Sequence, residues 1–151
     1  MTGTHEITGA VASGRTDDGF DDTMRELASA LTAMRRGDDG PCAALLTARD
    51  DATLFGAWGP IEQGHDQITE TWQWVASRFG PSGETVQDIR VVHRGGDLAV
   101  TVGFERGAAQ VDGGPLTEMV IRVTHVLRRE ADGWRLVHRH ADFPPADPRT
   151  D

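Results

Sequence analysis

The sequence predicts an α+β fold in which three N-terminal helices pack on one face of an antiparallel sheet. Apolar residues recur at intervals of three and four in segments between Phe20 and Phe79, which is typical of amphipathic helices. From Glu84 onward, apolar and polar residues alternate and glycine-containing turns separate the runs, which predicts four long strands. The chain has 151 residues, enough for one domain with its own apolar core.

The three helices are predicted from apolar stripes and from residues that begin and end helices. Asp21 or Asp22 caps the first helix and Gly37 ends it. Pro41 lies in the first turn of a short second helix, and Asp66 caps the third. The stripes consist of Phe20, Met24, Leu27, Leu31 and Met34 in the first helix, Leu45 and Leu46 in the second, and Ile68, Trp72, Val75 and Phe79 in the third.

Short and long strands follow from the remaining pattern. A short strand at 52–55 lies between the second and third helices, and the long strands cover 85–93, 98–106 and the two halves of 116–143. On the last strand one parity is shared by Trp134, Leu136, His138, His140 and Asp142. Residues of one parity lie on one face of a strand. This face begins apolar and ends in three ionisable side chains, so we expect any chemistry there.

Composition excludes several classes of function. The formal charge of −9 argues against a nucleic-acid partner, because phosphate binding needs a basic patch. No apolar run approaches 18 residues and the N-terminus lacks a secretory pattern, so we expect no membrane partner. The single cysteine, Cys42, is typical of a reducing cytoplasm, where we place the protein. We expect a disordered arm at 1–18, a folded domain at 19–143 and a flexible tail at 144–151.

Two phrases of the sequence resemble a known superfamily. RVTHVLRREADGWRLVHRHAD and DDATLFGAWGPIEQGHDQI are similar to the nuclear transport factor 2-like superfamily, in its SnoaL-like, ketosteroid-isomerase-like branch. The resemblance covers residues 20–143 and implies a cone-shaped, cystatin-like fold. In this fold a curved antiparallel or mixed sheet wraps around three N-terminal helices and encloses a cavity, usually in a homodimer. Members include isomerases, polyketide cyclases, dehydratases and non-catalytic association domains, so the fold does not transfer a function.

The catalytic residues of two of these groups do not carry over to this chain. Gly56 stands where ketosteroid isomerases have their aspartate base, and Ala30 lies near the place of their tyrosine; the chain has no tyrosine. Thr124 replaces their second oxyanion donor, so the steroid isomerase mechanism is excluded. The pocket arginines of kinase association domains fall on Thr124 and Ala141.

By the same matching, the resemblance implies which strand faces line the cavity. The expected cavity-facing residues are Val100, Val102, Phe104, Arg122, Thr124, Val126, His138, His140 and Asp142, with Trp58 and Trp72 near the mouth. The opposite parity is expected on the convex face as an apolar homodimer interface, and consists of Ile121, Val123, His125 and Leu127, with Val137.

These residues predict a site with three interpretations. His138 or His140 acts as a general base that Asp142 orients, while Arg122 and Thr124 stabilise negative charge. Alternatively the two histidines and Asp142 bind zinc, but a full ligand set is missing, so we expect no metal and no cofactor. In the third interpretation they only support the strand end, with Arg122 in an ion pair to Asp142 or Glu118. The substrate-binding candidates are Arg122, Thr124, Trp58, Trp72, Val100, Val102 and Phe104.

The sequence therefore predicts a small-molecule-binding protein and leaves its activity open. If it is an enzyme, we expect a cofactor-free isomerase, cyclase or dehydratase that transfers a proton on a carbonyl-containing, polyketide-like metabolite. The alternative is a non-catalytic ligand-binding or association module of the same fold. The sequence names no substrate.

Overall fold

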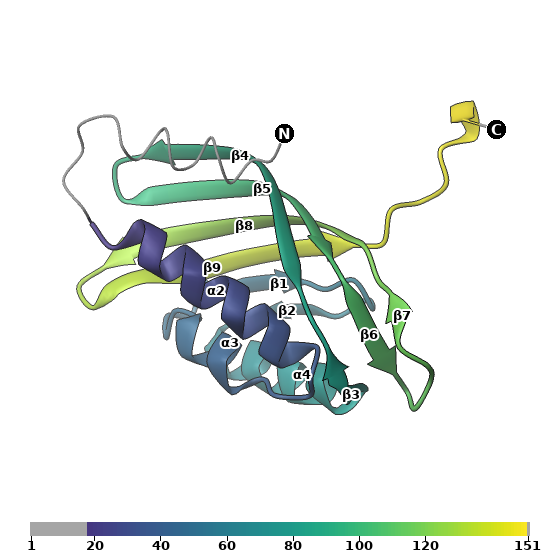
Figure 1. Cartoon of the computed structure of the whole chain (residues 1–151). Helices are drawn as coiled ribbons and strands as arrows, with labels where there is room; N and C mark the ends of the chain where they lie inside the picture. Colours follow the sequence, from purple (N-terminus) through teal and green to yellow (C-terminus); the bar gives the residue numbers. More distant parts are fainter. Residues whose placement is uncertain (1–17, 151) are drawn as a thin grey trace.

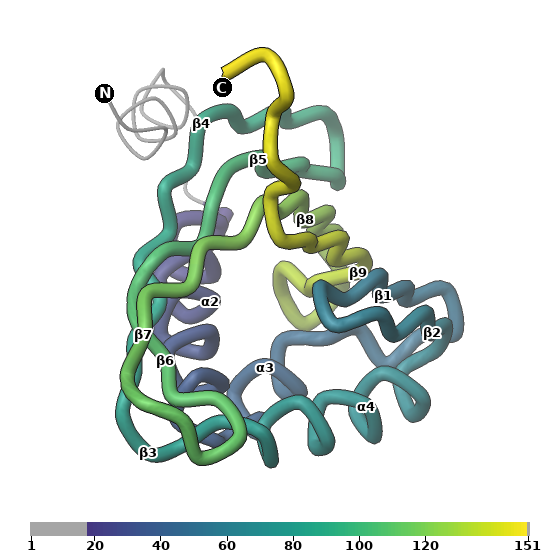
Figure 2. The backbone as a smooth tube through the Cα atoms, turned by 90° about the vertical axis from the view of Figure 1, so that its right-hand side faces the viewer, coloured from purple at the N-terminus to yellow at the C-terminus, as the bar shows by residue number. Residues whose placement is uncertain are grey.

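A strongly curved six-stranded sheet forms one side of the molecule, and helices close the other (Figures 1 and 2). The structure is a computed structural model that describes residues 18–150. The helices are α2 (Phe20–Met34), α3 (Gly40–Leu45) and α4 (His65–Ser77), and a short 3-10 helix, η1 (Pro148–Thr150), lies near the C-terminus. No helix among the described residues is long and apolar enough to cross a membrane.

The main sheet has the order β2-β1-β9-β8-β5-β4. Its strands are β1 (Thr53–Phe55), β2 (Ile61–Gln63), β4 (Val86–Gly95), β5 (Leu98–Arg106), β8 (Ile121–Glu130) and β9 (Gly133–Asp142). All neighbouring strands pair antiparallel except β1 and β9, which are parallel. The sheet is thus mixed and curved, as the family resemblance implied.

A second, three-stranded sheet was not predicted. It consists of β3 (Phe79–Gly83), β6 (Ala108–Val111) and β7 (Thr117–Glu118), in the order β3-β6-β7. Phe79 belongs to this sheet and not to the third helix, which ends at Ser77. The short β2 strand was also missed. These strands are only two to five residues long, and β3 also contains two glycines and a proline, so they carry little alternation.

Helix α2 begins two residues before the predicted caps. Gly19 is its N-cap in a left-handed conformation, and the Asp18 carboxylate accepts a hydrogen bond of 3.1 Å from the Phe20 amide. Asp21 and Asp22 lie in the first turn, where a negative charge favours the helix dipole. Asp66 lies inside α4 in the same way, after the N-cap Gly64.

Asp18 belongs to the folded part of the chain, although it was assigned to the disordered arm 1–18. It forms ion pairs with Arg94 and Arg129, and its carbonyl accepts a hydrogen bond from Trp134 Nε1. The rest of the predicted arm lies outside the described residues.

The core fills the concave side of the sheet. The apolar stripes of all three helices pack there against Leu54 of β1, Leu127 of β8, and Trp134 and Leu136 of β9. From β5, only small residues such as Ala99 enter this cluster. The larger β5 residues Val100, Val102 and Phe104 lie on the opposite, outer face.

A β-bulge in β9 changes which residues face the core. Leu136 pairs with Leu127, but His138 pairs with Val126, so Val137 is an extra residue and the parity changes after it. Trp134 and Leu136 are buried in the core, whereas His138 and His140 lie on the outer face beside Phe55. The prediction that all five residues of this parity share one face is wrong, because a bulge inserts one residue into the alternation.

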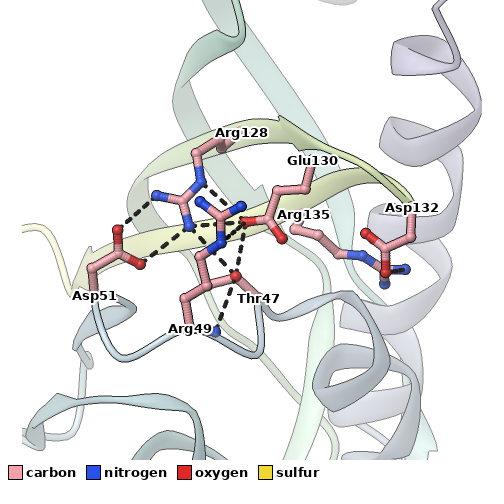
Figure 3. A network of polar contacts seen from close by, with 7 residues as sticks. All are labelled: Thr47, Arg49, Asp51, Arg128, Glu130, Asp132 and Arg135. Atoms are coloured by element: carbon pink, nitrogen blue, oxygen red, sulfur yellow. Dashed lines mark hydrogen bonds and ion pairs between the residues drawn. The ribbon is translucent and has the colours of Figure 1, made fainter.

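A polar network fastens the segment after α3 to the hairpin of β8 and β9 (Figure 3). Glu130 accepts hydrogen bonds from the buried Thr47 hydroxyl at 2.8 Å and from Arg128 at 2.8 and 3.0 Å. Arg128 also donates to both carboxylate oxygens of Asp51. These contacts hold β1, which follows directly, against the edge of β9.

Candidate functional site: a cavity inside the cone

An interior cavity lies between the helices and the concave face of the sheet. Its volume, counted as the space that the centre of a water molecule can reach, is about 70 Å³. This is several times the space that one water needs. Its wall is largely apolar, with Leu27 and Leu31 from α2, Trp72 and Val75 from α4, and Ile121 and Leu136 from the sheet. Apart from Thr85, whose hydroxyl donates to the Leu31 carbonyl at 3.0 Å, four polar side chains interrupt this wall, namely Arg35, Glu105, His125 and Arg139.

Glu105 of β5 and Arg139 of β9 form a buried ion pair across the intervening strand β8. Arg139 Nη1 donates to Glu105 Oε2 at 2.5 Å and Nη2 donates to Oε1 at 2.9 Å, a two-point contact. Burial would raise the pKa of Glu105, but the charge and hydrogen bonds of Arg139 outweigh it and hold the pKa below its usual value. The carboxylate is therefore ionised and fully engaged by Arg139.

His125 lies beside this pair and is fully buried. Its Nε2 atom is 2.9 Å from Arg139 Nη1. An arginine only donates, so Nε2 accepts and the ring proton of neutral His125 is on Nδ1. Burial, reinforced by the charge of Arg139, lowers the pKa of His125 to about 3, so the ring is neutral. Nδ1 is buried and has no hydrogen-bond partner among the described residues.

Arg35, the last polar residue of the wall, follows α2 directly. Its guanidinium donates to the carbonyl oxygens of Gly107 at 2.9 Å and Glu84 at 3.2 Å, and lies 3.5 Å from that of Glu105. Only 3% of the residue is exposed. Burial lowers its pKa below the usual value.

Aromatic residues and an arginine form the mouth of the cavity. Trp58 lines both the interior cavity and an outer groove next to β6 and β7. The guanidinium carbon of Arg78 lies 4.0 Å from the Trp58 ring centroid, and Arg78 also donates to Asp112 at 2.6 and 3.1 Å. This contact links three separate segments across the mouth.

The predicted catalytic residues do not line the interior cavity. An open groove on the outer face is lined instead by Val102, Phe104, Arg122, Thr124, His140 and Asp142. His138 is on the same face, where its Nδ1 lies 2.7 Å from Thr53 Oγ1. Arg122 donates to both oxygens of Asp142 at 2.7 Å, which is the ion pair considered as an alternative. The prediction that Val100, Val126, His138 and the residues of this groove face the cavity is therefore wrong.

The parity expected on the convex face faces the interior instead. Ile121 and His125 line the cavity, while Val123 and Leu127 are buried, and Val137 is the bulged residue. Trp58 and Trp72 do line the cavity, and their contact with a ligand stays a prediction. Among residues 18–150, no three His, Cys, Asp or Glu side chains are grouped so that they could hold a metal ion.

Sequence reasoning missed Arg35, Glu105, His125 and Arg139. A usable signal existed in β5 and β8. Glu105 shares a parity with Ala99, Thr101 and Gly103, and His125 with Ile121, Val123 and Leu127. A charged residue in a row of small residues indicates a face against which a helix packs closely. The large residues of β5 face outward, contrary to the prediction.

Comparison with known proteins decides the family. Residues 25–146 match the family described as the SnoaL-like domain. The chain belongs to this family. The SnoaL-like match includes α3, α4, all nine strands and all but the first five residues of α2. A comparison with curated proteins found no match.

Solved structures share the SnoaL-like fold at low sequence identity. A candidate dehydratase of the NTF2-like family from Streptomyces avermitilis is 22% identical, with a TM-score of 0.70 over 83% of this chain and 96% of that one. A candidate calcium/calmodulin-dependent protein kinase II association domain from Xanthomonas campestris is 16% identical, with a TM-score of 0.68 over 89% and 93%. An NTF2-like protein with a cystatin-like fold from Novosphingobium aromaticivorans is 18% identical, with a TM-score of 0.62 over 85% and 84%. At these identities the likeness shows the fold alone.

Proposed function

We propose that this SnoaL-like chain binds a small, partly apolar molecule in its interior cavity. The observation that carries the proposal is the buried Nδ1–H of His125, a donor without a partner among the described residues, in a residue that lines a largely apolar cavity. A buried donor without an acceptor costs about 1–3 kcal/mol. A ligand acceptor, such as a carbonyl oxygen, would remove this cost while its apolar body fills the cavity.

The geometry supports binding better than proton-transfer catalysis. Isomerisation, cyclisation or dehydration of a carbonyl compound needs a base that can take a proton. Among the described residues that line the cavity, Glu105 is the only carboxylate, and Arg139 bonds both of its oxygens. His125 is neutral, but its Nε2 already accepts from Arg139. A ligand-binding module is therefore our first candidate, and a cofactor-free enzyme for a polyketide-like metabolite is the second.

The predicted catalytic residues His138, His140 and Asp142 lie on the outer face of the sheet. We propose that this face associates with a second copy of the chain. Four large apolar side chains on it are 39–78% exposed, namely Phe55, Ile61, Val91 and Val102. Large apolar side chains exposed at both edges of this face favour an interaction site. We also propose a cytoplasmic location. The free thiol of the single cysteine, Cys42, supports it, because reducing compartments keep thiols unpaired.

Toluene, a neutral ring, tests binding in the cavity. We expect toluene to raise the melting temperature of the protein in proportion to its occupancy of the folded state. Val75→Phe fills the cavity and should abolish this shift, whereas Val91→Phe adds the same atoms to the outer face and should leave it unchanged. A shift of equal size in all three proteins would contradict binding in the cavity.

A further inference from the structure

The polar residues of the cavity carry one positive charge in excess. Arg139 and Glu105 neutralise each other through two hydrogen bonds. His125 is neutral because its pKa is about 3, and Cys42 is a neutral thiol because burial raises its pKa to about 12. Arg35 is the remaining ionisable group of the cavity wall. Its charge has no counterpart in the wall.

Arg35 is held by backbone carbonyls and not by a carboxylate. The guanidinium contacts carbonyl oxygens of Glu84, Glu105 and Gly107, and no carboxylate within the described part of the chain forms an ion pair with it. These contacts use Nη1 twice and Nη2 once. A guanidinium has five N–H donors, so two remain without an acceptor among the described residues. Burial lowers the pKa of Arg35 and outweighs the charges of Glu105 and Glu118, which also favour the cation.

Arg35 and His125, the two residues with donors that lack an acceptor, both line the cavity and both lie beside Glu105. Arg35 Nη2 is 3.5 Å from the backbone oxygen of Glu105, and His125 Nε2 is 3.9 Å from its carboxylate. Arg35 and His125 therefore both lie at the polar end of the cavity, one as a cation and the other as a neutral donor. The remaining wall is apolar.

We propose that the cavity binds a monoanionic organic acid, with its carboxylate beside Arg35, one oxygen accepting from His125 Nδ1–H, and its apolar body among the leucines. This rests on the proposed function and names its ligand class. Two oxygens on one planar group match the remaining donors of a guanidinium. A neutral carbonyl compound would satisfy His125 and leave the charge of Arg35 uncompensated, and a cation would add to it.

Three ligands of nearly the same shape separate these cases. Benzoate, benzamide and benzamidine carry charges of −1, 0 and +1 on the same ring. We expect benzoate to bind at least ten-fold more tightly than benzamide in isothermal titration at pH 7, and benzamidine not to bind. Val75→Phe should abolish benzoate binding.

Variants of Arg35 and His125 test whether these two residues cause the preference for benzoate over benzamide. His125→Phe removes the donor and keeps a ring, so benzoate should bind about ten-fold more weakly. Arg35→Gln removes the charge and should make benzoate and benzamide bind equally, while Arg35→Lys should keep the preference. Arg36→Gln is the matched control, since Arg36 also donates to a backbone carbonyl, that of Gly83 at 2.7 Å, but is exposed and lies outside the cavity wall. If Arg35→Gln fails to fold, His125→Phe and the three wild-type titrations still decide.

Each outcome separates this inference from the proposed function. Equal binding of benzoate and benzamide to the wild type would overturn the anion proposal and leave binding in the cavity standing. If toluene binds and Val75→Phe abolishes its binding, but benzoate does not bind, the anion proposal is likewise overturned and binding in the cavity stands. Failure of toluene and of all three ring compounds to bind would overturn both.

Discussion

His125 is a neutral histidine enclosed by protein, and its environment makes the stability of the fold depend on pH. Burial and the charge of Arg139 lower its pKa from 6.5 to about 3. In the unfolded chain this side chain would take up a proton near pH 6.5. Between these values the unfolded state binds more protons, so stability falls as pH decreases. The full window corresponds to roughly 4–5 kcal/mol of unfolding free energy.

We therefore predict that acid destabilises the protein above the range in which carboxylates titrate. Between pH 6.5 and 5 the free energy of unfolding in urea should fall by about 1 kcal/mol per pH unit. His125→Gln should flatten this slope, because the titrating group is gone. His93→Gln, at an exposed site on β4, should keep it. An unchanged slope in His125→Gln would mean that the ring is not held neutral.

The pKa of His138 is also lowered, chiefly by partial burial and next by the charge of His140, so it acts in the same direction. His138→Gln should remove only a small part of the slope, because its side chain remains partly exposed to solvent.

Among the elements, the mouth of the cavity depends on contacts between segments that are distant in sequence. Trp58 belongs to the loop between β1 and β2, Arg78 follows α4, and Asp112 follows β6. Trp58 also packs against Phe79, with ring centroids 5.1 Å apart. The Gly56 amide donates to the Pro60 carbonyl at 2.9 Å, which closes the loop that carries Trp58.

We predict that Arg78→Ala loosens this loop. Loss of the stacked guanidinium should speed hydrogen exchange of the Gly56 amide several-fold. Arg90→Ala is the matched control, since Arg90 also forms a two-point ion pair, with Asp88, and lies 5.1 Å from an aromatic ring, that of Phe104, but on β4. Equal exchange rates in both variants would show that Arg78 does not hold the mouth.

The elements also show how far the sequence predicts the structure. The helix stripes and the long hairpins give the α+β class and most boundaries, because each depends on local periodicity, whereas the curved, mixed sheet was implied only by the family resemblance. The inward faces of β5, β8 and the end of β9 were predicted wrongly. Val137 inserts one residue into β9, and no turn residue marks it. The cavity cluster joins Arg35, Glu105, His125 and Arg139 from four segments, so no local motif could show it.

At the scale of the whole molecule, the outer face of the sheet is the surface available to a second copy. We predict a homodimer in light scattering at micromolar concentration. Val102→Glu should produce a monomer, because it places a charge in an apolar contact. Leu116→Glu, more exposed but remote from the six-stranded sheet, should remain dimeric. A monomeric wild type would contradict the interface.

The central claim is that the functional site lies inside the cone at His125 and not on the outer face at His138 and His140. The most direct measurement is NMR of protein labelled with ¹⁵N in histidine, titrated with benzoate. We predict that the Nδ1 and Nδ1–H signals of His125 shift as benzoate binds, while those of His138 and His140 stay in place. Shifts confined to His138 and His140, with His125 unchanged, would contradict the account.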